Sequence, residues 1–535
     1  MPQNFIRGDD PDQAYLLPPD VRDWLPRQHL AWELMGLAQD VDLGPFTSWY
    51  RADGQGRPAY HPAMMVALVC YCFCKGVRSS RGIEAATFDD VGARVICGNL
   101  HPGHSTVHRF LTRHEQPVKA LLAASVVACA RQGLVSVDVV AGDGTKVKAN
   151  ASAAANVTLG VLDADIAGLE RLVAAEVDAW VEQAKAADAQ DGLDGLDDGG
   201  GGQPGPPPGA GRALARTAGT LARRRAARER LAGEQAARRA DAEAQRAAKI
   251  TRLERRAARA AVSAAAKAAA ADEKAAAWQR RAAAKAAARP GKRPDGRAPA
   301  RAADNAHVAR ARAAAARAGA ALERARATPA PAGKPAKINT TDPSSKMMQA
   351  KNGGFGQLHN IQALASKDQV ILGISAHPSP VDVAALHPLI KTSRATLDAA
   401  GITTKIGTAL FDAGYASDDN FTTSCEAELY VAVTKEARQT GRLADGKKPN
   451  TTKPSWQQMA AKLDTPQGKA LYRQRAAIIE PVFAQLFARL GTRLNYRDQR
   501  ADLELHLWAT SHNLLKAIRA QRRHTPQTTA PAPAT

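Results

Sequence analysis

The sequence has little of what stabilises a small secreted protein or crosses a membrane. Its 535 residues contain only six cysteines, which excludes a scaffold built on disulfides. The longest apolar run, residues 64–74, is about half of the ~20 residues that a membrane-spanning helix needs. The N-terminus has no basic segment followed by an apolar one, so no signal peptide is expected. These absences predict a cytoplasmic protein that makes no membrane contact.

Three of the six cysteines lie close together and raise the question of a zinc site. Cys70, Cys72 and Cys74 stand in the apolar run. On a helix, Cys70 and Cys74 share a face and Cys72 points away. Buried thiols are therefore the expectation, and a zinc site is the alternative.

Acidic residues are scarce in one part of the chain, and this imbalance carries nearly all of the net charge. The formal net charge is +21, and residues 211–330 supply +20 of it, with 30 Lys and Arg against 10 Asp and Glu. Such a basic stretch indicates a polyanionic partner. The alternative is a solvated basic linker.

Residues 1–130 are predicted to form a helical N-terminal domain. The apolar stretch at 61–77 is typical of a buried helix. Further on, a polar and basic helix that Ser105 or Thr106 could cap carries Arg109 and Arg113. A short turn before such a helix is compatible with docking on DNA, and equally with an ordinary bundle helix.

Beyond residue 130 the sequence predicts alternating strands and helices, interrupted once. Residues 134–150 are predicted to be a strand, a glycine turn and a strand. The whole order predicts an α/β domain made of residues 131–156 and 336–522. Residues 157–335 contain Ala- and Arg-rich helices with Pro- and Gly-rich breaks, too poor in large apolar residues for a core of their own, and are expected to be a helical insertion. Residues 523–535 are expected to be a disordered tail.

Three acidic residues are candidates for one site. Asp143 and Asp412 each end an apolar strand and precede a glycine-containing turn, and ligands in α/β sheets bind beyond the carboxyl ends of strands. Glu480 is the third, on a long helix that should kink or restart at Pro481. Taken alone, Asp143 and Asp412 are each more typical of a turn or a helix cap, and Glu480 would be unremarkable. Asp138 is a rival for the first position.

Converging carboxylates predict two bound Mg²⁺ ions, for which Mn²⁺ would substitute. Magnesium takes oxygen donors, and two such ions promote in-line displacement at phosphorus. Asp143, Asp412 and Glu480 are therefore the predicted catalytic metal ligands. Nearby cationic and aromatic side chains would contact DNA phosphates; the candidates are Lys146, Lys148, Tyr472, Arg473 and Arg475.

Several segments in this order resemble the DDE-class transposases of bacterial insertion sequences. These are "DGTKVKANAS", "DPSSKMM…GQLHNIQALAS", "FDAGYAS", "YRQRAAIIEPVFAQL" and "ELHLWATSHNLLKAI". The block at 58–114 resembles the domain that precedes their catalytic core. The resemblance covers about 1–156 and 336–520 and implies an RNase H-like catalytic core.

The resemblance also assigns residues. The three acids of the family fall on Asp143, Asp412 and Glu480, and the Tyr and Arg that precede the third acid fall on Tyr472 and Arg475. Many relatives carry a basic residue about two turns after the glutamate, where this chain has Phe487 and only then Arg489.

The function implied is transposition of double-stranded DNA. Water would cut at the terminal inverted repeats of the element, and the freed 3′-OH would attack target DNA at the same site. A homodimer or larger assembly on nucleoid DNA is expected. The alternatives are an RNase H-fold nuclease that never joins DNA, and a non-catalytic DNA-binding protein that acts through its Ala/Arg-rich helices.

Overall fold

The computed structural model describes residues 24–50, 58–191, 210–289, 296–331, 335–350, 353–434 and 453–524. The chain divides into two compact units, residues 1–155 with 341–535 (the core unit) and residues 156–340 (the arm unit). Most of the predicted tail lies outside the described residues, since the last described helix ends at His524. Among the described helices, none combines the length and the apolar composition that a membrane crossing requires.

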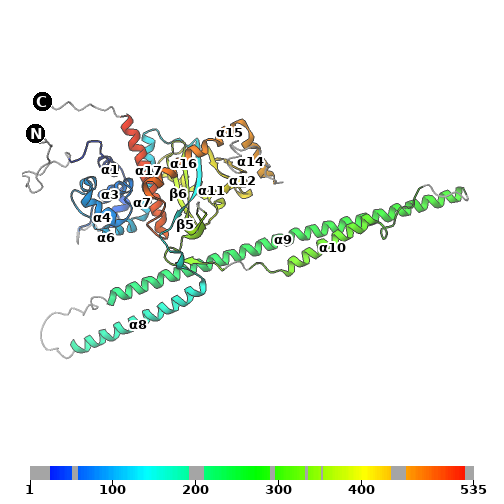
Figure 1. Cartoon of the computed structure of the whole chain (residues 1–535), viewed down its shortest axis with the longest axis horizontal. Helices are drawn as coiled ribbons and strands as arrows, with labels where there is room; N and C mark the ends of the chain where they lie inside the picture. The colour runs from blue at the N-terminus through cyan, green and yellow to red at the C-terminus, as the bar shows by residue number, and fades with distance from the viewer. Residues whose placement is uncertain are drawn as a thin grey trace, which may run out of the picture. The chain divides into compact units, whose positions relative to one another are not determined.

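The N-terminal part of the core unit is helical, as predicted (Figure 1). Its helices are α1 (Leu30–Gln39), α2 (Gly44–Thr47), α3 (Pro62–Cys74), α4 (Ser80–Asp89), α5 (Val91–Ile96), α6 (His104–Arg113) and α7 (Glu115–Arg131). Helix α3 is buried over nearly its whole length. Its three cysteines are buried as expected, and burial raises the pKa of the Cys70 thiol to about 12, which opposes the thiolate that zinc would need.

The sheet of the core unit is mixed. Its strands are β1 (Val139–Lys148), β4 (Lys346–Gln349), β5 (Phe355–Ser366), β6 (Ile371–His377), β7 (Thr408–Phe411) and β8 (Glu428–Val431). Strand β1 lies between β5, antiparallel to it, and β7, parallel to it, while β8 is parallel to β7. Strand β5 also pairs antiparallel with both β4 and β6.

Helices cover both faces of this sheet. The remaining helical segments of the unit are η2 (Ala153–Ala155), η3 (Val383–Ala385), α11 (Leu386–Ala399), η4 (Ala413–Tyr415), α12 (Asp418–Thr422), α14 (Pro454–Asp464), α15 (Pro466–Tyr472), α16 (Gln474–Leu490) and α17 (Gln499–His524). Helix α16 packs on β1 and β5, and α11 packs on β5 and β6. Helix α17 packs against β6, α3 and α7, and its apolar residues Leu503, Leu507, Leu514 and Ile518 are buried.

Residues 139–148 form one continuous strand, so the predicted glycine turn in this segment is wrong. The two glycines serve close packing instead. A Cβ on Gly142 would clash with the ring of Phe411, and one on Gly144 would lie 2.5 Å from the Gln362 amide nitrogen. Glycine inside a strand often marks such an approach. Asp143 therefore lies within β1, just past the end of the pairing with β7.

Helix α16 runs through Pro481 without a break, so the prediction that a new helical segment begins there is wrong. Proline cannot donate to the carbonyl four residues earlier, which belongs to Ala477. The side-chain amide of Gln369 donates to that carbonyl instead, at 3.1 Å. The break lies at Arg473, between α15 and α16, and the side chain of Thr465 caps α15.

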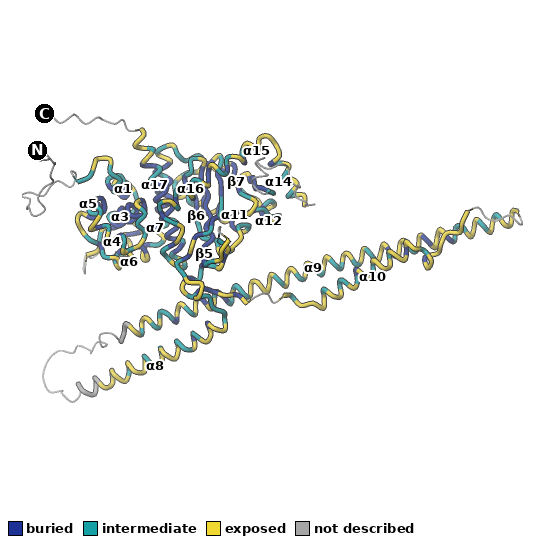
Figure 2. Tube along the Cα trace, viewed as in Figure 1, coloured by how far each residue is buried: buried dark blue, intermediate teal, exposed yellow. Residues whose placement is uncertain are grey.

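The arm unit consists of a short strand pair and three helices. Strand β2 (Asn156–Val157) pairs antiparallel with β3 (Ile338–Asn339). Helix α8 (Leu159–Asp191) lies beside the first part of α9 (Ala210–Ala288), and α10 (Ala306–Ala327) lies beside the second part (Figure 1). The predicted Ala/Arg-rich helices are thus confirmed, and most of their surface is exposed (Figure 2).

Small residues close the seam between α9 and α10. The buried positions there include Ala264, Ala271, Ala275, Val308 and Ala318. On α9 these alanines lie seven and four residues apart, the spacing of one helix face. An alanine seam lets two helices pair without a large apolar core.

Candidate active site

Two of the three predicted acids are neighbours across parallel strands. Ala141 on β1 pairs with Leu410 on β7. Two residues further along each strand stand Asp143 and Asp412, so both carboxylates leave the same face of the sheet at the same level. The expectation that strand-end aspartates converge is met by this pair. The oxygen Oδ1 of Asp412 accepts a hydrogen bond from the Gly414 amide at 2.9 Å, which fixes the loop after β7.

Helix α16 brings a buried cation to Asp143. Nη1 of Arg475 lies 3.5 Å from Oδ2 of Asp143, and Arg475 is only 2% exposed. Tyr472 is equally buried, whereas Arg473, at the junction of α15 and α16, is exposed. Of the three predicted phosphate-contacting residues of this segment, only Arg473 is turned to solvent.

Glu480 stands on the same helix, five residues after Arg475, and is exposed. The helix packs on β1, so Glu480 belongs to the face of the sheet that Asp143 occupies. Its carboxylate makes no hydrogen bond or ion pair with the residues that the structure describes. The structure therefore joins Asp143, Asp412 and Arg475 but leaves Glu480 in solvent beside them.

A fourth carboxylate, Asp382, was missed by sequence reasoning. It lies in the loop between β6 and η3, and its Oδ1 accepts hydrogen bonds from the side-chain amides of Asn360 at 2.8 Å and Gln362 at 2.7 Å. Gln362 in turn accepts a hydrogen bond from the hydroxyl of Tyr415. The available signal was the pair of amide residues in the otherwise apolar strand "LHNIQALAS", because buried amides need partners.

The charges of three of these acids act on Tyr415. Burial raises the pKa of Tyr415, and the negative charges of Asp382, Asp143 and Asp412 raise it further, while Arg475 lowers it. The hydroxyl is therefore protonated at neutral pH and donates to Gln362. Asp382, Gln362 and Tyr415 form a chain of contacts that ends beside the aspartate pair.

Gly144 and Gly414 leave space beside the carboxylates of Asp382 and Asp412. A Cβ on Gly414 would lie 3.0 Å from Oδ1 of Asp412 and 3.4 Å from Oδ2 of Asp382. A Cβ on Gly144 would lie 2.7 Å from Oδ1 of Asp382. Any larger residue at either position would fill this space.

The donor set suits a hard divalent cation. The carboxylates offer only oxygen, which Mg²⁺ prefers, and the glycine-lined space lies between two of them. Across the described ranges, no three His, Cys, Asp or Glu side chains are gathered closely enough to enclose a metal ion. The chemistry of the donors fits Mg²⁺.

The predicted DNA-contacting lysines of β1 face away from the aspartates. Side chains alternate along a strand, so Lys146 and Lys148 leave the face opposite Asp143. The backbone of Lys148 is hydrogen-bonded on both sides, to Thr492 and Leu494 in the loop after α16. A role of the two lysines in DNA binding would thus concern another surface than that of Asp143.

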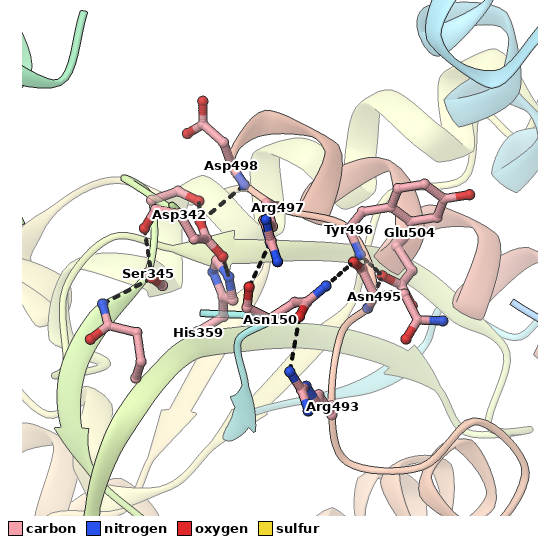
Figure 3. Close-up of polar contacts among 12 residues, drawn as sticks. Asn150, Asp342, Ser345, His359, Arg493, Asn495, Tyr496, Arg497, Asp498 and Glu504 are labelled. Carbon is pink, nitrogen blue, oxygen red and sulfur yellow. Dashed lines mark hydrogen bonds and ion pairs between the residues drawn. The ribbon is translucent and has the colours of Figure 1, made fainter. Parts of the chain in front are cut away.

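The same loop is fixed by a polar network (Figure 3). The side chain of Asn150, just after β1, donates to the carbonyl of Asn495 at 2.8 Å and accepts from Arg493 at 2.9 Å. Asp342, from the "DPSS" segment, accepts from the Asp498 amide at 2.9 Å and contacts the buried ring of His359 at 2.9 Å. These contacts hold the segment between α16 and α17 against the end of β1, and so place α16.

Three other basic residues named from the sequence, Arg489, Arg109 and Arg113, lie on helices α16 and α6. Arg489 is largely buried, and burial lowers its pKa, with the Arg519 charge acting in the same direction and Cys74 of α3 opposing it. It therefore lies toward α3 and α17. Arg109 and Arg113 are exposed on α6, whose buried side consists of Val107, Phe110 and Leu111. Gly103, rather than the predicted Ser105 or Thr106, occupies the N-cap of α6.

Comparison with known families gives two matches on this chain. Residues 19–113 match the model of a transposase domain (DUF772), and residues 327–514 match that of a transposase DDE domain. No curated protein and no solved structure matches. Asp412, Asp382 and Glu480 lie within the second match. Asp143 lies between the two, and it is the pairing of β1 with β5 and β7 that joins it to them.

Proposed function

The chain belongs to the insertion-sequence transposases of the DDE class, and from this we propose that it cuts DNA at the terminal inverted repeats of its element and joins the freed 3′ ends to target DNA. The observation that carries the proposal is the placement of Asp143 beside Asp412 on parallel strands. The order of the strands, β6–β5–β1–β7–β8, supports an RNase H-like core.

The two aspartates would hold divalent cations, Mg²⁺ or Mn²⁺. Metal bound there would activate the attacking hydroxyl and stabilise the leaving oxygen of the phosphodiester. Arg475 lies beside Asp143, where its charge balances that of the carboxylate. Because cutting and joining are the same in-line displacement, one site serves both.

The third acid is assigned by the motif and the fourth by position. We propose that Glu480 completes the catalytic set and that Asp382, held by Asn360 and Gln362, adds to the affinity for metal. Titration of the protein with Mn²⁺, followed by electron paramagnetic resonance, tests whether Asp382 contributes to the affinity for metal. Asp382→Asn should weaken Mn²⁺ binding about tenfold, as for loss of a metal-site supporting group. Unchanged affinity in that variant would remove Asp382 from the metal site.

Contacts to DNA would come from several exposed basic residues. Arg473 stands beside the site, and Arg109 and Arg113 stand on α6 of the N-terminal helices. We propose that α6 contacts the element ends, with the two arginines on phosphates. A homodimer or larger assembly would bring two ends together.

The decisive experiment is incubation of the purified protein with labelled DNA that carries the repeats flanking its gene, with Mg²⁺ or EDTA. Cuts at the repeat boundary that require Mg²⁺ and are absent from Asp143→Ala would support the proposal. Cutting by that variant at the wild-type rate would contradict it.

A supercoiled target plasmid in the same reaction tests the joining step. Joined products support a transposase, whereas cuts without joining favour a nuclease that uses the same acids. DNA binding that is unchanged by replacing Asp143, without any cutting by the intact protein, would favour a non-catalytic DNA-binding protein.

A further inference from the structure

The arm unit contains two helix pairs of different charge. The α8 arm consists of α8 with residues 210–232 of α9, and the α10 arm consists of residues 233–288 of α9 with α10. Helix α8 carries eight acidic and two basic residues, and residues 210–232 carry one acidic and seven basic residues. The α8 arm is therefore electrically neutral overall.

Three ion pairs across the α8 arm join arginines of α9 to acidic residues of α8. Arg228 lies 2.5 Å from Asp163, Arg225 lies 2.7 Å from Glu170, and Arg224 lies 3.6 Å from Asp165. Each pair joins α9 to α8. Pairs this exposed add little stability, but they neutralise charge locally.

The α10 arm lacks such compensation. Residues 233–288 and 306–327 contain 18 Lys and Arg against seven Asp and Glu, a net charge of +11. Besides the alanine seam, two polar contacts between described residues join α9 to α10: Arg326 pairs with Glu254 at 2.7 Å, and Arg246 donates to the carbonyls of Arg326 and Thr328. Helix α10 contains one acidic residue, Glu323, which pairs with Arg326 of the same helix.

Four arginines of this arm stand together on the side turned away from α10. Ile250, Glu254 and Ala257 are half-buried, and Glu254 contacts α10, so these positions mark the seam. Arg252, Arg256 and Arg259 each follow a seam position by two residues, about 200° around the helix. With Arg255 they form the arginine face, and all four are exposed.

We propose that the arginine face of the α10 arm binds the phosphate backbone of double-stranded DNA, and that the α8 arm does not bind DNA. The proposal rests on the proposed function for its partner. Guanidinium groups match phosphate oxygens in charge and geometry. A helix of about 55 residues spans roughly 80 Å, long enough to lie along more than two turns of duplex.

The composition of the arm favours a duplex over single strands. Proteins that hold single-stranded DNA or RNA stack bases on aromatic side chains. Residues 233–327 contain one Phe, Tyr or Trp residue, Trp278. Contacts through charge alone read no sequence, so the binding is expected to be independent of sequence and strongly dependent on salt.

The test uses the full chain and two variants that each remove four charges from α9. The first replaces the arginine face (R252Q, R255Q, R256Q and R259Q). The matched control replaces four exposed arginines of the α8 arm (R216Q, R223Q, R225Q and R228Q). Binding to a fluorescent duplex without the repeats is measured by anisotropy over a series of NaCl concentrations, and circular dichroism verifies that the helices are retained.

The arginine-face variant should bind the duplex about 10- to 100-fold more weakly at low salt, with a log–log salt slope reduced by about 2 to 4. The control should keep affinity within about threefold. A third variant with lysine at the same four positions keeps the charge and should restore most of the binding. Equal losses in the first two variants, or preference of the face for single-stranded RNA or an acidic peptide, would overturn the proposal.

Failure of this inference can be told apart from failure of the proposed function. The same protein is assayed for Mg²⁺-dependent cutting at the repeats with and without Asp143→Ala. Cutting that depends on Asp143 with no effect of the arginine face on duplex binding would refute only the role of the arm. Loss of duplex binding in the arginine-face variant without any cutting would refute only the catalytic assignment.

Discussion

The core unit and the arm unit use amino acids in opposite ways. In the core unit, each side chain of the candidate site is placed by residues far along the chain, as when Arg475 on α16 reaches Asp143 on β1. In the arm unit, neighbouring turns of one helix repeat the same alanine seam and the same arginines. The difference suggests that single residues decide the chemistry of the core unit, whereas the arm unit acts through a sum of similar charges.

The first test of this difference replaces one residue in each unit. Asp412→Asn should lower the rate of cutting by about a thousandfold or more, because it removes a ligand from a site with few. Arg256→Gln alone should change duplex binding by no more than about threefold at 0.1 M salt, because it removes one of many charges. Cutting rates and anisotropy measure the two. Loss of most duplex binding on replacing a single arm residue would contradict this difference between the units.

The buried polar network behind the site gives a second test. Asp342→Asn should destabilise the core unit by about 3 kcal/mol, since it breaks a buried pair with His359 that also receives backbone and hydroxyl hydrogen bonds. Chemical unfolding of both proteins measures this difference. The loop at 491–498 should loosen as well, and cutting should fall with it.

The pH dependence of that loss has a defined sign. Burial would raise the pKa of Asp342, but the hydrogen bond from His359, its charge and further hydrogen bonds outweigh it, so the pKa lies below the ordinary value. A depressed pKa stabilises the fold above the unfolded value of about 4 and loses this effect as the pH falls through the folded value. The gap between wild type and Asp342→Asn should therefore be full at pH 7 and shrink below about pH 4. A gap that widened on acidification would contradict this account.

Substitution of Arg475 tests whether the shape of this side chain, or only its charge, matters beside Asp143. Arg475→Lys keeps the charge but loses the planar fork, and it should slow cutting by about 10- to 100-fold while duplex binding stays unchanged. Arg473→Lys, at the neighbouring exposed position, is the matched control and should cut at close to the wild-type rate. Equal effects of the two would mean that burial beside Asp143 has no bearing on the reaction.

These contrasts also show what the sequence could predict. Apolar strands followed by Asp143 and Asp412 were sufficient to predict a shared edge, because parallel strands align their ends. The face of the sheet that Asp143 occupies was predictable only once β1 was known to be continuous. That continuity depends on Phe411 and Gln362, which pack against the glycines of β1. The uninterrupted α16 depends on an amide from Gln369, more than a hundred residues before Pro481. Asp382 was missed for the same reason: its partners are distant in sequence.

The smallest expected effect comes from adding one methyl group to a glycine in each unit. It compares the two units directly. Gly142→Ala should destabilise the core unit by about 1 to 3 kcal/mol, because its Cβ would meet the ring of Phe411. Gly233→Ala, in α9, meets nothing within 4 Å and should stabilise the helix by about 0.5 to 1 kcal/mol. Hydrogen exchange of the amides around residue 233 should slow by about two- to fivefold, whereas amides of β1 should exchange faster in the first variant. Destabilisation by both substitutions would show that α9 depends on contacts at Gly233 as the sheet depends on them at Gly142.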